Sequence, residues 1–264
     1  MQEGISVFSP DGRLLGHAPL QGAGALCVCD QSLFCADGGG VIWRFDTESL
    51  MPQTVFSGGP GICDLCLSPD GERLYALLGD ADSVFLCDAR STQALALNRC
   101  GCNPCSLALC GDTLAVAGGE SGCVHLFDAA TLESRGVIPM PGPVYDVVFC
   151  ADAICALCLK PQLNTQLVLY WRGLRQSLTL RGMPGCLLAR EGRLLAATQG
   201  RLFAFACDSV RPLAERAAPG RPSRMCMADG RLILYDPLSE RAFSSGAGTA
   251  WRLIGSGVRA LCPV

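Results

Sequence analysis

The chain has 264 residues, half of them apolar and 17% charged, with a formal net charge of −3. This balance creates no long-range field that favours nucleic acid or an anionic membrane, so we expect neither as a partner. A chain of this length can bury about three quarters of the surface that its unfolded form exposes, which is enough for one large domain over residues 1–264.

The N-terminal stretch "MQEGISVFSPDGRLLG" lacks a basic segment followed by an apolar one, and the sequence has no apolar window of 18 residues. We therefore expect a cytoplasmic protein with no signal peptide and no transmembrane segment. The 18 cysteines mostly alternate within apolar patterns such as "ALCVCD" and "ICALCL", as small buried residues do. We expect reduced thiols, and the alternative is an extracellular disulfide framework.

Short apolar strands separated by Gly and Asp turns follow one another along the whole chain. The residues that end the third strand of each repeat are Phe45, Cys87, Phe127, Tyr170, Phe205 and Phe243, at steps of 42, 40, 43, 35 and 38 residues. Four short strands with their turns fill such a spacing, which is the size of one blade of a β-propeller. The third repeat shows the order clearly, as "CSLALC", "TLAVAGG", "CVHLFD" and "SRGVIPM" alternate with turns.

The number of innermost strands predicts the number of blades. Seven candidates occur in chain order: "GALCVCD", "ICDLCLS", "CSLALC", "YDVVFC", "CLLAR", "SRMCMAD" and "VRALCPV". We therefore predict an all-β, seven-bladed β-propeller, with blades 1 to 6 over about residues 22–256. The last blade is expected to have three strands, from residues 1–21 and 257–264, so that both termini close the ring and remove its free edge.

The stretch "SPDGERLYALLGDADSVFLCDARSTQAL" resembles the repeat of YVTN-type β-propellers, a family that includes YncE-like and lactonase-like seven-bladed proteins. "VIWRFDTESL" and "CVHLFDAATLESRGVIPM" carry the second half of the same pattern, and weaker copies cover nearly the whole chain. The resemblance implies the fold but not one function, because such propellers include binding modules, surface proteins and lactonase-like enzymes.

A ligand site is expected where the innermost strands begin, at the rim of the central channel. The aligned positions there are Ala25, Asp64, Ser106, Asp146, Cys186, Arg224 and Arg259. Two carboxylates and two guanidinium groups at one rim would orient a polar or anionic ligand, with the carboxylates as acceptors or bases. The alternative is that these charges line a solvated channel and neutralise one another.

The turn "RCGCNPCS" holds Cys100, Cys102 and Cys105, whose spacing suits a soft metal such as zinc if a fourth ligand comes from elsewhere. No His is near in sequence, and we expect a turn of small residues and no metal or other cofactor. The two histidines, His17 and His125, lie in predicted outer and third strands, which argues against His-dependent catalysis at the rim.

Two classes of function follow from these patterns. The first is a monomeric, non-enzymatic scaffold that presents its loops and channel rim to an unidentified protein or small molecule. The second is a lactonase-like or lyase-like enzyme whose axial site consists of Asp64, Asp146, Arg224 and Arg259. A redox or metal-sensing role for the turn from Cys100 to Cys105 is a third possibility.

Overall fold

A computed structural model of the chain describes residues 4–8, 13–29, 32–57, 59, 61–228, 230–246 and 250–256. Strands make up the regular structure of these residues, apart from one 3-10 turn, η1 (Pro161–Leu163). The all-β prediction is therefore confirmed. None of the described segments is a helix long and apolar enough to cross a bilayer.

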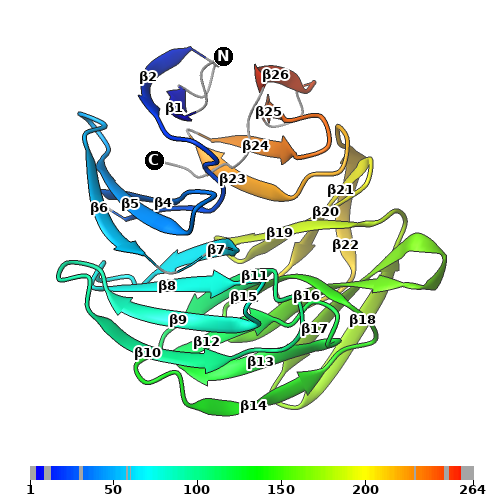
Figure 1. Ribbon diagram of the computed structural model, residues 1–264. Coiled ribbons are helices and arrows are strands. Elements are labelled where there is room, and N and C mark those ends of the chain that lie inside the picture. Colours follow the sequence, from blue (N-terminus) through cyan, green and yellow to red (C-terminus); the bar gives the residue numbers. More distant parts are fainter. Residues whose placement is uncertain are drawn as a thin grey trace. The chain divides into compact units, whose positions relative to one another are not determined.

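The strands form six four-stranded antiparallel sheets, called blades 1 to 6 in chain order, and one two-stranded sheet (Figure 1). The chain divides into unit 1 (Met1–Leu97 with Met225–Val264) and unit 2 (Asn98–Arg224), which are described separately. In every blade the four strands are hydrogen-bonded in sequence order, so each blade is a simple meander.

Unit 1 contains the two-stranded sheet and blades 1, 2 and 6, apart from residues 98, 99 and 224 at two strand ends. The two-stranded sheet is β1 (Gly4–Phe8) and β2 (Leu14–Pro19). Blade 1 is β3 (Leu26–Cys29), β4 (Ser32–Ala36), β5 (Val41–Asp46) and β6 (Pro52–Ser57). Blade 2 is β7 (Ile62–Leu67), β8 (Arg73–Leu78), β9 (Ser83–Asp88) and β10 (Ala94–Arg99). Blade 6 is β23 (Arg224–Ala228), β24 (Arg231–Asp236), β25 (Arg241–Ser245) and β26 (Arg252–Ser256).

Unit 2 contains blades 3, 4 and 5. Blade 3 is β11 (Ser106–Cys110), β12 (Thr113–Ala117), β13 (Cys123–Asp128) and β14 (Ser134–Pro139). Blade 4 is β15 (Val144–Cys150), β16 (Ala153–Lys160), β17 (Asn164–Trp171) and β18 (Leu174–Leu180). Blade 5 is β19 (Pro184–Arg190), β20 (Arg193–Thr198), β21 (Arg201–Ala206) and β22 (Pro212–Ala217). The first strand of each blade is one of the predicted innermost strands.

The prediction of seven blades is wrong, because the structure has six four-stranded blades. The N-terminal strands β1 and β2 pair with each other as a separate two-stranded sheet. Their apolar side chains Ile5 and Ala18 pack in one cluster with Leu33, Cys35 and Phe45 of blade 1. Alternating apolar residues indicated strands correctly but did not determine their pairing partner. The predicted closing strand, residues 258–264, lies outside the described residues.

Two recurring turns explain the repeat pattern. In the "SPDG" turn, the Asp70 carboxylate accepts hydrogen bonds from the Ser68 hydroxyl and the Glu72 N–H, and Gly71 adopts the left-handed φ of 69°. At the end of the third strand, Asp46 and Asp88 each accept bonds from N–H groups two and three residues later. The pKa of each carboxyl group is lowered by these bonds, first by the N–H three residues later.

A β-bulge near the start of β15 sets the faces of that strand. Val144 pairs with Cys158 and Asp146 pairs with Leu157, so Tyr145 is an extra residue between two paired ones. Because adjacent residues point to opposite faces, the bulge places Val144 and Asp146 on opposite faces of blade 4. Val144 packs in the core cluster shared with blade 3, which leaves Asp146 on the other face. Strand β7 has the same irregularity between Ile62 and Asp64.

Candidate functional site

Asp146 connects the first strands of all three blades in unit 2. One carboxylate oxygen, Oδ1, accepts hydrogen bonds from the Ser106 hydroxyl at 2.5 Å and from the Val147 N–H at 2.9 Å. The other oxygen, Oδ2, accepts the N–H of Leu187 at 2.6 Å. Ser106 lies on β11 and Leu187 on β19, so one side chain of β15 bonds to the strands on both sides.

The group formed by Asp146 and its hydrogen-bond donors Ser106, Val147 and Leu187 is buried, which indicates a structural role. Ser106 and Asp146 are only 3% and 6% exposed, and a buried carboxylate is tolerated only when hydrogen bonds replace its lost hydration. Three hydrogen bonds, shared between both oxygens, provide that replacement. Cys186, another predicted rim position, is also buried beside Leu187. The structure thus brings Ser106 and Asp146 into contact, but it uses the carboxylate to join strands.

The remaining predicted rim residues are distributed over both units. Asp64 lies in unit 1, where it pairs with Leu77 in the ladder of β7 and β8. Burial, and to a smaller extent the Asp64 carboxylate, raises the pKa of the Cys66 thiol to about 12. Arg224 ends unit 2 and donates from Nη1 to the Ser223 carbonyl at 3.4 Å. Arg259 lies outside the described residues.

The thiols of the turn before β11 have different surroundings. Cys100 is fully buried, whereas Cys102 is exposed. Cys105 donates to the carbonyls of Val144 and Tyr145, with sulfur–oxygen distances of 3.0 and 3.2 Å. Among the residues that the structure describes, no group of three His, Cys, Asp or Glu side chains is placed to hold a metal ion. The contacts of Cys105 instead join blade 3 to the start of blade 4.

A basic surface lies at the end of unit 2 where its first strands begin, which we call the entry end. We call this surface the basic entry surface, and it consists of Lys160, Arg181, Arg201, Arg221 and Arg224. Arg221 donates from Nε to the Pro184 carbonyl at 2.9 Å, and its guanidinium carbon lies 5.4 Å from the centre of the Tyr145 ring. The Thr198 hydroxyl donates to the Arg181 carbonyl at 2.7 Å. These contacts bring the connections of blades 4 and 5 together at the entry end.

Basic residues outnumber acidic ones in and around blades 4 and 5. Residues 153–224 contain eleven Lys or Arg and only three Asp or Glu. Glu191 and Asp208 follow β19 and β21, at the end opposite the entry end, and Glu215 forms an ion pair with Arg201. The connections of blades 4 and 5 at the entry end, residues 140–143, 161–163, 181–183, 199–200 and 218–223, contain no acidic residue, whereas the blade 3 connection at that end, residues 118–122, contains Glu120. The net charge of the whole chain concealed this run, although a count by segment would have found it.

Comparisons with known proteins identify the class of fold. No family model and no curated protein matches the chain. Hydrazine synthase from Kuenenia stuttgartiensis matches with a TM-score of 0.75 and 14% identity, over 86% of this chain and 77% of that chain. The WD40 repeats of RRP9 match with a TM-score of 0.68 and 16% identity, over 95% and 84%. U3-55K matches with a TM-score of 0.69 and 14% identity, over 88% and 80%.

At these identities the likeness shows the fold alone. The chain has a β-propeller fold, and a shared fold does not by itself assign a function. The predicted propeller fold is confirmed, and its assignment to the YVTN-type family is not matched by any family model.

Proposed function

We propose that this protein is a non-catalytic binding scaffold whose basic entry surface holds an acidic segment of a partner protein. The observation that carries the proposal is the excess of basic residues in blades 4 and 5, where five cationic side chains lie in or next to entry-end connections that contain no acid. Guanidinium groups bind carboxylates through paired hydrogen bonds, so a peptide rich in Asp or Glu suits this surface. Arg201 is already paired with a carboxylate there, that of Glu215.

Two features favour an acidic peptide over a nucleic acid. Proteins that bind single-stranded nucleic acids stack bases on exposed aromatic rings. Among the described residues of blades 4 and 5, Tyr145 is the aromatic residue at the entry end, and Arg221 already lies over its ring. Outside residues 153–224 the chain has 21 acidic and ten basic residues, which repel a long polyanion.

The environment of Asp146 supports a scaffold over the lactonase-like or lyase-like alternative. A general base needs a lone pair directed at its substrate, and a metal ligand needs one directed at its metal. Both oxygens of Asp146 instead accept bonds from Ser106, Val147 and Leu187 within the buried interior. Removing these bonds to free the carboxylate would leave buried donors unsatisfied.

We also propose that the repeats are of the YVTN type and that the protein is cytoplasmic. The "SPDG" turn, with Asp70 bonded to Ser68 and Glu72, supports the first proposal because that family's repeat begins with the same four residues. Fifteen of the described cysteines are outside a disulfide, which supports a reducing compartment.

Binding of a fluorescent twelve-residue poly-glutamate peptide, followed by anisotropy at low and physiological salt, tests the proposed function. Replacing Lys160 and Arg181 by Glu should weaken binding at least about tenfold, because attraction becomes repulsion at two of five positions. The matched control replaces Arg190 and Arg193, at the opposite end of the same unit, by Glu. This control should change the affinity less than about twofold.

Two results would contradict the proposal. Equal losses in the two double variants would mean that the peptide responds to the general charge of the chain. Tighter binding of a single-stranded RNA twelve-mer than of the peptide would assign the surface to nucleic acid instead. A poly-glutamine peptide of the same length provides the uncharged reference.

A further inference from the structure

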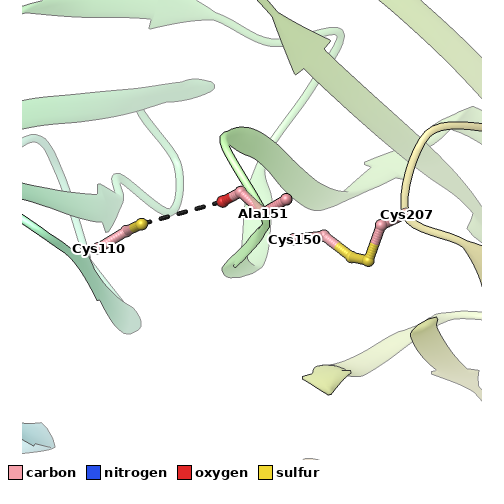
Figure 2. The surroundings of a disulfide bond; sticks show 4 residues. All are labelled: Cys110, Cys150, Ala151 and Cys207. Atoms are coloured by element: carbon pink, nitrogen blue, oxygen red, sulfur yellow. Dashed lines mark hydrogen bonds between the residues drawn. A yellow bond between two sulfur atoms is a disulfide. The ribbon is translucent and has the colours of Figure 1, made fainter. Parts of the chain in front are cut away.

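A disulfide links two blades of unit 2 at the end opposite the basic entry surface. Cys150 is the last residue of β15 in blade 4, and Cys207 follows β21 in blade 5 (Figure 2). Their Cα atoms are 5.4 Å apart, within the range that a disulfide requires, although 57 residues separate them in sequence. The expectation of reduced thiols therefore fails at this pair.

The two sulfur atoms differ in access. Cys150 is only 2% exposed and belongs to the core cluster between blades 4 and 5. Cys207 is half-buried, and its N–H donates to the Gly192 carbonyl in the turn between β19 and β20. A thiol or disulfide reagent in solution therefore reaches Cys207 first.

Neighbouring cysteines are poorly suited to the same reaction. Cys155 packs in the same cluster as Cys150, and Cys158 packs on the opposite face of β16. Burial raises the pKa of both thiols to about 12, so almost none of the reactive thiolate form exists at neutral pH. Cys110 is directed at the carbonyl of Ala151, 3.9 Å away, in the turn that follows Cys150 (Figure 2).

We infer that Cys150 and Cys207 are a selective, reversible oxidation site that closes when the reduced protein meets a small-molecule disulfide such as oxidised glutathione. The Cys207 thiolate attacks one glutathione sulfur, which forms a mixed disulfide and releases one glutathione thiolate. Cys150, after losing its proton to solvent, then attacks the Cys207 sulfur and releases the second glutathione thiolate. Two protein thiols are oxidised, and one glutathione disulfide is reduced to two thiols.

Closure of this pair constrains unit 2. The bond joins the end of the first strand of blade 4 to the turn between the third and fourth strands of blade 5. It encloses a segment of the chain that contains β16 to β21, so it removes conformations from the unfolded state. The oxidised protein should therefore unfold at a higher temperature than the reduced protein, by about 10 °C.

The test uses the full chain, reduced with a phosphine, freed of the reductant and then incubated with oxidised glutathione. Thiols are blocked with N-ethylmaleimide under denaturing conditions, and peptides are mapped by mass spectrometry without reduction. The expected product is one cross-linked peptide pair containing Cys150 and Cys207, with the other cysteines alkylated. Cys207→Ser should abolish the difference in melting temperature between the oxidised and reduced forms, whereas Cys110→Ser should keep it.

Alkylation of both Cys150 and Cys207 after the glutathione treatment would overturn the inference, and this readout needs no variant to fold. A redox-dependent melting temperature that persists in Cys207→Ser would also overturn it. Because the pair lies at the end opposite Lys160 and Arg181, these outcomes are independent of whether the acidic peptide binds.

Discussion

Replacing Asp146 by Asn tests whether this residue holds the three blades of unit 2 together. The amide keeps one acceptor oxygen, but it places an N–H₂ donor against the N–H of either Val147 or Leu187. The remaining hydrogen bonds in the variant are made to a neutral amide and are weaker than bonds to a carboxylate, and one buried N–H donor is left unsatisfied. Together these two effects lower the free energy of unfolding by about 3 kcal/mol. For a chain of this size that corresponds to a melting temperature lower by roughly 6–12 °C.

Thermal and urea unfolding, followed by circular dichroism, measure the effect. Ser106→Ala serves as the partner variant, since it removes one donor to the same carboxylate and should cost about 1–2 kcal/mol. The double variant should be less destabilised than the sum of the single ones, because the two side chains share a bond. An Asp146→Asn protein that unfolds like the wild type would refute the structural role and return Asp146 to the candidates for catalysis.

Two further predictions concern blade 3. Burial lowers the pKa of His125 below its ordinary 6.5, and its buried Nε2 has no hydrogen-bond partner within the described part of the chain. The folded state therefore binds the proton more weakly than the unfolded state, and stability should fall as the pH drops below 6.5. In His125→Phe, the melting temperature should change less between about pH 7 and pH 5 than it does in the wild type. An unchanged pH dependence would assign the effect to other groups. Gly119 has φ of 50°, and a Cβ there would lie 1.8 Å from the Asn103 carbonyl oxygen. Gly119→Ala should cost about 2 kcal/mol or more, whereas Gly200→Ala, with open space around it, should cost about 1 kcal/mol; equal costs would remove the steric explanation.

The repeat and the blade interior were readable from the sequence because they depend on local patterns. Phe45 and Phe127 were placed at the ends of third strands by spacing alone, and both are almost fully buried there. Asp70 and Gly71 were recognised as a turn because their chemistry acts within four residues. The predicted number of blades is wrong because of residues 4–19. The two strands expected there do form, but they pair with each other as a separate sheet.

The sites were less predictable because their partners are distant in sequence. Ser106 and Asp146 were aligned as equivalent positions of different blades, but a shared alignment position does not indicate a hydrogen bond across 40 residues. The pairing of Cys150 with Cys207 was hidden among many cysteines that serve as small core residues. In each case, the packing of one blade against the next supplies the missing contact.

The bulges at the starts of β7 and β15 have a consequence for protein engineering. Cys63 in blade 2 and Tyr145 in blade 4 are each inserted between two paired residues, so the register beyond them does not depend on their identity. Randomising Cys63 in unit 1 and Tyr145 in unit 2 would diversify the start of each first strand while its hydrogen-bonded ladder stays in place. These two positions offer a designer variable residues on strands, which hold side chains more precisely than loops do.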